Sequence, residues 1–157
     1  MSPRSTVPEF SVVALDAVVD GIRAFAESAP WDGGTAEELL IGFVTAWTPE
    51  VDELFETWLR VTGTALPHDA VAHAYVRRAR ATGLDWLVDR VALLRARGVV
   101  GPHVDPEESA ARILLAFESS LYSGRRADRE ARRAMVMRGV AEQLQRCARP
   151  APLRQAV

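Results

Sequence analysis

The amino-acid sequence predicts an all-α protein, a helical bundle of about six helices. Apolar residues recur at steps of three and four along most of the chain, as on one face of an α-helix. No segment shows the two-residue alternation expected of a half-buried strand. Helix-start residues and glycine or proline stops divide this pattern into about six segments.

The first helix is predicted over residues 10–28, where charged residues lie opposite an apolar stripe. The proline- and glycine-containing segment 30–34 ends it. A capping box then opens the second helix, because the Thr35 hydroxyl can accept from the backbone while Glu38 reaches back. The buried stripe of the second helix is predicted to extend to Trp47.

Pro49 is predicted to end the second helix and to start the third, since proline fits a first helical turn but not a helix interior. The apolar stripe of the third helix ends near Gly63. A long helical segment follows between Pro67 and Gly98. Gly83 lies in its middle and predicts a kink or a short break there.

The last two helices have strong start signals. Asp105 is followed by proline and two glutamates, which is typical of an N-cap, a first helical position and an acidic first turn. Asp128 is predicted to cap the last helix, whose apolar stripe includes Cys147. The sequence therefore predicts one domain over residues 10–148, with disordered tails at 1–9 and 149–157.

Composition indicates an ordinary globular protein, because 48% of the 157 residues are apolar and 25% are charged. The single cysteine, Cys147, cannot form an internal disulfide and suits a reducing cytoplasm. No apolar run reaches the roughly 18 residues of a membrane span, and the first residues do not resemble a signal peptide. We therefore expect a cytoplasmic protein without membrane contact.

Charge is distributed unevenly along the chain, although the net charge is only −2. Residues 9–56 hold eleven carboxylates against one arginine, whereas residues 125–154 hold nine arginines against three carboxylates. The arginines can be a nucleic-acid footprint or the edge of a protein contact. The second interpretation is favoured because these arginines surround a helix with an apolar stripe and no base-reading element lies beside them.

The order of these elements resembles the C-terminal ligand-binding and dimerisation domain of tetracycline-repressor (TetR) family transcriptional regulators. The resemblance rests mainly on the arginine–glycine turn and the Asp-Pro-Glu helix start within residues 94–112, and on the opening helix from Phe10. It covers roughly residues 10–147. The family's N-terminal helix-turn-helix would precede Phe10, where only nine residues stand. We expect a piece of a regulator or a protein with the effector domain alone, without sequence-specific DNA contact of its own.

The resemblance implies a cavity for a small apolar or aromatic effector, walled by aromatic side chains. Each ring can also simply fill the core, but as a set they favour a pocket. Glu118 adds a carboxylate beside the apolar stripe of its helix, where it must be paired, solvated or protonated. The predicted ligand-binding residues are Phe43, Trp47, Phe55, Trp58, Tyr75, Trp86, Phe117, Glu118 and Tyr122.

No catalytic residue, metal site or cofactor site is predicted. The three histidines lack metal-ligand spacing, and neither a nucleophile elbow nor a phosphate loop is present. An alternative function is a small cyclase or isomerase that reuses this fold, with Glu118 as a general acid or base. His73, Arg77 and Thr62 are further polar candidates, with a solvated pair and a core residue as the simpler interpretations.

A homodimer is expected through the last two helices, as the resemblance implies. Small side chains on the fifth helix allow close approach, and the last helix combines apolar residues with arginines on one stripe. The competing interpretation is that both faces close on the protein's own core. The predicted interface residues are Ser109, Ala116, Ser120, Arg129, Arg133, Val136, Met137, Val140 and Leu144.

Overall fold

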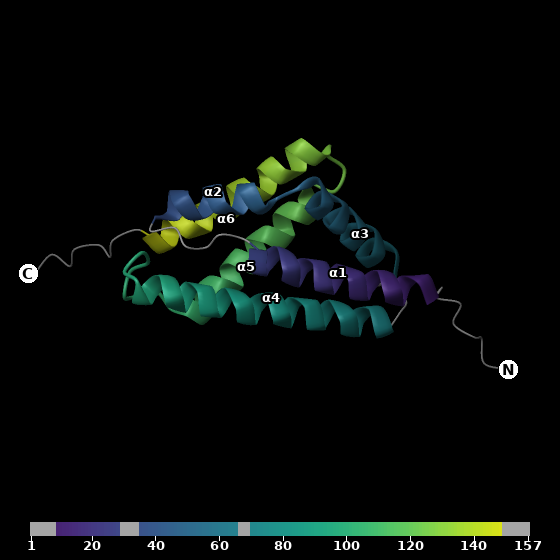
Figure 1. Cartoon of the computed structure of the whole chain (residues 1–157), viewed down its shortest axis with the longest axis horizontal. Coiled ribbons are helices and arrows are strands. Elements are labelled where there is room, and N and C mark those ends of the chain that lie inside the picture. Colours follow the sequence, from purple (N-terminus) through teal and green to yellow (C-terminus); the bar gives the residue numbers. More distant parts are fainter. Residues whose placement is uncertain (1–8, 29–34, 66–69, 149–157) are drawn as a thin grey trace, which may run out of the picture. The chain divides into compact units, whose positions relative to one another are not determined.

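The computed structural model describes residues 9–28, 35–65 and 70–148, and every regular element within these ranges is an α-helix (Figure 1). This confirms the predicted all-α fold of about six helices. The helices are α1 (Glu9–Ser28), α2 (Ala36–Ala46), α3 (Pro49–Ala65), α4 (Ala70–Ala96), α5 (Pro106–Ser123) and α6 (Arg129–Ala148).

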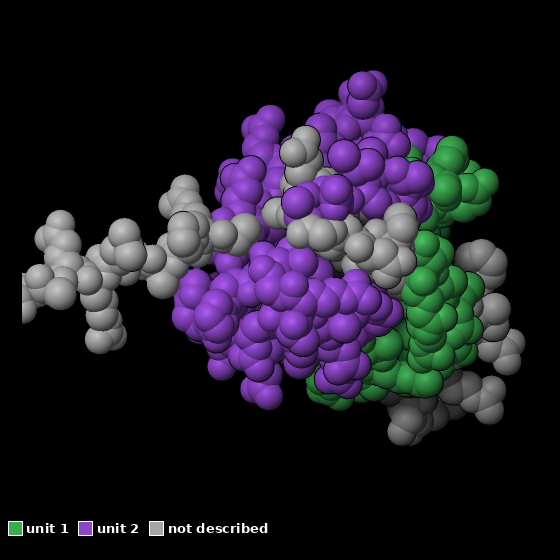
Figure 2. Space-filling view, turned by 60° about the vertical axis from the view of Figure 1, so that its left-hand side comes forward, with its two compact units in different colours: residues 1–28, 47–83 green, residues 29–46, 84–157 purple. Residues whose placement is uncertain are grey.

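The chain forms two compact units, which are coloured separately in Figure 2. Unit 1 comprises residues 1–28 and 47–83, and therefore holds α1, α3 and the first half of α4. Unit 2 comprises residues 29–46 and 84–157, with α2, the second half of α4, α5 and α6. The single domain predicted over residues 10–148 stays a prediction.

In unit 1, α1 packs against α3 at a glycine. A Cβ atom added to Gly21 would lie only 2.7 Å from Cδ1 of Leu54, so the missing side chain is what allows this approach. Val18 and Val19 of α1 and Val51 of α3 are buried in the same unit. The apolar stripes seen in the sequence are thus the faces that these two helices bury.

In unit 2, α5 and α6 form an antiparallel hairpin, and α2 also packs on α6. The two hairpin helices approach closely where Gly139 of α6 faces α5. A Cβ atom at Gly139 would lie 2.5 Å from the Ser120 hydroxyl oxygen and 3.3 Å from the Ala116 carbonyl oxygen. Small residues on both helices therefore set the distance between them.

Local hydrogen bonds start the helices where the sequence predicts. Asp105 Oδ1 accepts from the backbone N–H groups of Glu107 and Glu108, at 2.8 and 3.0 Å. Asp128 Oδ1 accepts from the N–H of Ala131 at 2.8 Å, and Thr35 accepts from Glu38 at 3.1 Å. These side chains satisfy backbone donors that have no partner inside the helix.

The long fourth helix ends at a glycine whose φ is +75°, namely Gly98. The N–H of Val99 donates to the carbonyl of Leu94 at 3.0 Å, which closes the helix end as in a Schellman motif. Arg95 Nη1 also donates to the Val104 carbonyl at 3.1 Å and ties the following loop to α4. The loop thereby delivers the chain to the Asp105 cap.

Two helix ends and one predicted helix break differ from the prediction. Trp47 is not part of the second helix, because α2 ends at Ala46; the following Thr48 precedes Pro49, and a residue before proline is biased away from the helical region. The third helix continues through Gly63 to Ala65. Gly83 does not break α4, which is continuous over 27 residues because one glycine costs a helix only about 1 kcal/mol.

The predicted tails fall almost wholly outside the described part of the chain. Residues 1–8 and 149–157 are not among the described residues. Glu9, the last residue of the predicted N-terminal tail, is the first residue of α1. The difference is within the usual uncertainty of a helix boundary.

Candidate functional site

Aromatic rings form the interior of unit 1. Phe25 lies edge-on to both Trp47 and Phe55, with ring centroids 6.1 Å apart in each case. Trp47 and Phe55 contact one another in a tilted arrangement with centroids 5.0 Å apart. All three rings are buried. The structure thus brings together two of the predicted ligand-binding residues and adds Phe25, which the sequence prediction did not include.

A buried carboxylate accompanies this cluster. Trp47 Nε1 donates to Asp52 Oδ1 at 2.8 Å, and only 8% of Asp52 is exposed. Sequence reasoning missed this residue because an acid in the first turn of a helix is normally explained by the helix dipole. The available signal was Trp47 itself, close to Pro49 in the sequence, since a buried indole N–H needs a hydrogen-bond acceptor.

Two further predicted ligand residues lie in unit 1. Trp58 is buried, and its carbonyl accepts a 2.8 Å hydrogen bond from the hydroxyl of Thr62, which is also buried. Tyr75 is half-buried, and its hydroxyl donates to the Asp16 carboxylate. This hydrogen bond raises the pKa of Tyr75 above its ordinary value, because it favours the neutral phenol.

The other predicted ligand residues belong to unit 2. Trp86 is half-buried, with the Arg90 guanidinium 5.4 Å from its ring centroid. Phe117, Glu118 and Tyr122 are half-buried on α5. The side chain of Phe43 is outside the described residues. A cavity shared by all nine predicted residues, and a catalytic role for Glu118, therefore remain predictions.

Several predicted interface residues face the interior of the chain. Val136, Val140 and Leu144 are buried, and Val136 has no exposed surface. Ser109, Ala116, Ser120, Arg133 and Met137 are half-buried, and Arg129 is exposed. Because Ser120 lies against Gly139 of the same chain, small side chains on α5 serve the hairpin itself.

The exposed side of the hairpin carries different apolar residues. Leu115 of α5 is 59% exposed and Met135 of α6 is 37% exposed. They lie among exposed alanines and residues of both charges, and this outer face consists of Glu108, Ala111, Arg112, Leu115 and Ser119 on α5 with Ala131, Met135, Arg138 and Glu142 on α6. Sequence periodicity alone did not identify it, because these apolar residues fall outside the stripes that the helices bury.

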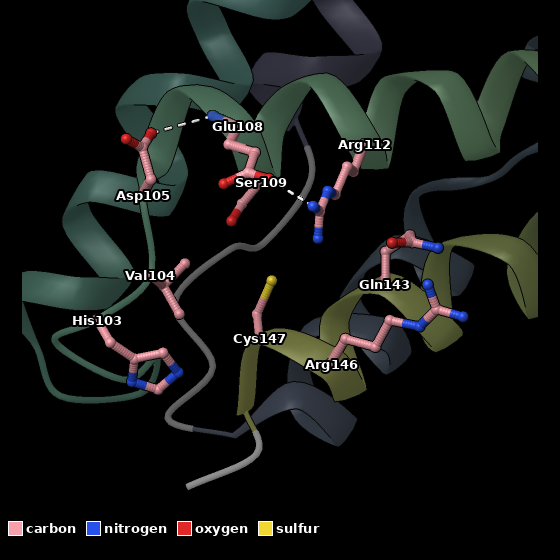
Figure 3. A pocket seen from close by; sticks show the side chains of 9 residues that line it. All are labelled: His103, Val104, Asp105, Glu108, Ser109, Arg112, Gln143, Arg146 and Cys147. Carbon is pink, nitrogen blue, oxygen red and sulfur yellow. Dashed lines mark hydrogen bonds and ion pairs between the residues drawn. The ribbon is translucent and has the colours of Figure 1, made fainter. Parts of the chain in front are cut away.

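A hollow of about 180 Å³ lies at the open end of the hairpin (Figure 3). Its walls come from the loop before α5, the first turns of α5 and the last turns of α6. The Cys147 sulfur points into it, opposite Glu108 and Ser109 (Figure 3). Asp105 caps α5 and Glu108 pairs with Arg112, so both carboxylates that line the hollow already have partners.

The arginine-rich part of the chain is only partly a surface feature. Arg132 is buried, and its Cγ lies 3.1 Å from the position a Cβ would take on Gly124. Arg125 Nη1 donates to the Tyr122 carbonyl at 2.9 Å and so closes the end of α5. At least two of these arginines therefore hold the α5–α6 turn.

Neither metal-binding clusters nor membrane spans are present in the described part of the chain. Over residues 9–28, 35–65 and 70–148, no three histidine, cysteine or acidic side chains are placed to hold a metal ion. None of the helices in these ranges is long and apolar enough to cross a membrane. Comparison with known proteins gives no match: no family model, no curated protein and no solved structure matches this chain.

Proposed function

We propose that this chain is the small-molecule (effector) binding and dimerisation domain of a cytoplasmic transcriptional regulator, as its resemblance to the TetR family implies. The proposal includes no sequence-specific DNA contact by the described helices. The observation that carries it is the outer face of the α5–α6 hairpin, where Leu115 and Met135 are exposed on the last two helices.

The outer face supports dimerisation through its composition. Covering exposed leucine and methionine side chains with a partner lowers the free energy, because their apolar surface is removed from water. Glu108, Arg112, Arg138 and Glu142 provide both signs of charge around these apolar residues. A two-fold contact places the same surface on both subunits, so a face with both signs of charge can complement itself. These features support a second copy of this chain as the partner.

The aromatic cluster of unit 1 supports the choice of effector. Phe25, Trp47 and Phe55 present large apolar surfaces beside one buried acceptor, Asp52. Small-molecule sites typically combine such surfaces with a few polar groups. A small apolar or aromatic molecule that inserts beside these rings would change their environment.

Ligand binding can be tested with a panel of small apolar and aromatic compounds. At least one is expected to raise the melting temperature and to change tryptophan fluorescence, because ligands of the folded state stabilise it. Replacing Trp47 by phenylalanine is expected to remove most of the fluorescence change. Trp86→Phe alters a predicted ligand residue of unit 2 in the same way, and it should leave that change intact if the effector binds beside the rings of unit 1. A panel without any stabilising compound, or a response carried by Trp86 alone, contradicts this placement of the effector.

A further inference from the structure

A shallow hollow of about 270 Å³ lies between α1 and α3 in unit 1, and none of the clustered aromatic rings lines it. Ala17 and Val18 line it from α1, and Leu54 from α3. Glu50, Glu53 and Thr57 complete its wall. It is therefore an apolar floor with two carboxylates at its edge.

The floor of this hollow is built into the helix pair. Leu54 lies against Gly21, where a Cβ atom would be 2.7 Å from Leu54 Cδ1. The hydroxyl of Thr57 donates to the Glu53 carbonyl at 3.0 Å, and Arg60 donates to that hydroxyl at 3.4 Å. The apolar surface is thus formed by residues whose positions are set by the α1–α3 contact.

The two carboxylates carry negative charge that the described residues do not neutralise. Glu50 and Glu53 are exposed and three residues apart, so they lie on the same side of α3. Neither forms an ion pair with another described residue. A hydrogen bond from the Thr48 hydroxyl, helped by the Glu50 backbone N–H, lowers the pKa of Glu50 below its ordinary value. Its carboxylate therefore stays charged at neutral pH.

The volume and the exposure of the hollow favour one kind of occupant. Small-molecule pockets usually have about 300–1,000 Å³ and enclose most of their ligand. The hollow is smaller, and both of its carboxylates are exposed to solvent. A side chain presented by a protein partner needs no enclosure, because its own backbone holds it in place. An arginine matches both features, since its aliphatic stem packs on apolar surface while its guanidinium pairs with carboxylates.

We propose that the α1–α3 hollow docks an arginine side chain presented by a protein partner, with its stem on the Ala17–Leu54 floor and its guanidinium between Glu50 and Glu53. This contact is independent of the effector and of the α5–α6 outer face. It gives the acidic α1–α3 region a partner of complementary charge.

The test uses the full chain and a helix-forming peptide of about 15 residues, with arginine and leucine along one face. A matched peptide carries glutamate in place of arginine. Fluorescence anisotropy of labelled peptide is expected to show binding of the arginine peptide only. The double variant Glu50→Gln with Glu53→Gln should weaken that binding about fivefold or more. Asp85→Asn with Asp89→Asn removes the same charge from exposed positions of α4 and should leave the affinity within about twofold.

A second variant keeps both carboxylates and fills the hollow. Ala17→Arg places a cation of the chain itself on the floor, and it should abolish peptide binding while circular dichroism shows an unchanged helix content. Equal weakening by the α4 control, equal binding of the glutamate peptide, or no binding of the arginine peptide overturns the proposal. Competition by free arginine amide at the peptide's concentration assigns the hollow to a small molecule instead. Loss of self-association in the Glu50/Glu53 variant assigns it to a second copy.

Discussion

The interiors of the two units are packed in different ways. Unit 1 buries large aromatic rings, and a tryptophan outside the helices bonds to the buried Asp52. Unit 2 is built on close approach of two helices at Gly139, with aliphatic side chains such as Val136 and Val140 beside it. Large rings bury more surface per residue, whereas small residues fix the distance and register of two helices.

The two kinds of packing predict different responses to amino-acid substitution. Removing one ring from the cluster leaves a cavity, so unit 1 is sensitive to lost side-chain volume. The glycine crossing is sensitive to the opposite change, because an added side chain meets the neighbouring helix. Unit 1 is therefore expected to respond most to removed side-chain volume, and the hairpin of unit 2 to added volume.

The largest effect is expected from emptying the ring cluster. Phe55→Ala should lower the free energy of unfolding by about 3–5 kcal/mol, since a buried ring leaves both lost burial and a cavity. Phe55→Leu, which keeps more of the volume, should cost clearly less. Urea unfolding followed by tryptophan fluorescence measures both. A cost of Phe55→Ala below about 1 kcal/mol would show that the cluster is not a core.

Overpacking the hairpin tests the other unit. Gly139→Val should destabilise by about 1–3 kcal/mol, because its side chain meets the Ser120 hydroxyl and the Ala116 carbonyl. Gly139→Ala creates a steric clash with the Ser120 hydroxyl, and adding Ser120→Ala removes that clash. The double variant should therefore be more stable than Gly139→Ala alone. Thermal unfolding followed by circular dichroism measures the series. If Gly139→Val is as stable as the parent chain, the close approach of α5 and α6 is wrong.

Removing a helix cap is expected to have a smaller effect. Asp105→Ala should cost about 1 kcal/mol, because the N–H groups of Glu107 and Glu108 lose their acceptor. Asp105→Asn should retain most of the stability, since its side-chain oxygen can still accept. Chemical denaturation reports both values, and equal losses for the two variants would argue against capping as the cause.

The smallest effect concerns Tyr75 at the surface of unit 1. The hydrogen bond to Asp16 raises the pKa of Tyr75 above 10.0. This hydrogen bond therefore stabilises the folded chain below pH 10.0, and the stabilisation is lost as the pH rises through the pKa of the folded state. Ultraviolet titration of the phenol in a Tyr122→Phe background isolates Tyr75. Asp16→Asn should return its pKa towards 10.0. The same pKa in both proteins would exclude the Asp16 contact.

The sequence predicted what depends on neighbours along the chain. Thr35, Asp105 and Asp128 were assigned as helix starts because a cap bonds to backbone groups within three residues. The fold class followed from the apolar periodicity for the same reason. Of the two alternatives predicted at Gly83, the break was wrong because a single glycine does not outweigh a helix that continues on both sides, and the kink stays a prediction.

Contacts between distant residues were not predictable in this way. Nothing near Phe25 in the sequence indicates Trp47 or Phe55, which depend on how α1 meets α3. The same holds for Ser120 and Gly139, which are nineteen residues apart and meet only because the hairpin closes. Leu115 and Met135 were overlooked because an exposed apolar residue is common on ordinary surfaces.

The central claim, a domain that pairs through the α5–α6 outer face, is tested most directly by light scattering after size-exclusion chromatography. The parent chain is expected to have the mass of two copies, and Leu115→Glu with Met135→Glu the mass of one. Ile41→Glu with Val44→Glu alters two other exposed apolar residues, on α2, and should remain a dimer. A parent chain that is monomeric at all concentrations, or a Leu115/Met135 variant that stays dimeric, contradicts the account.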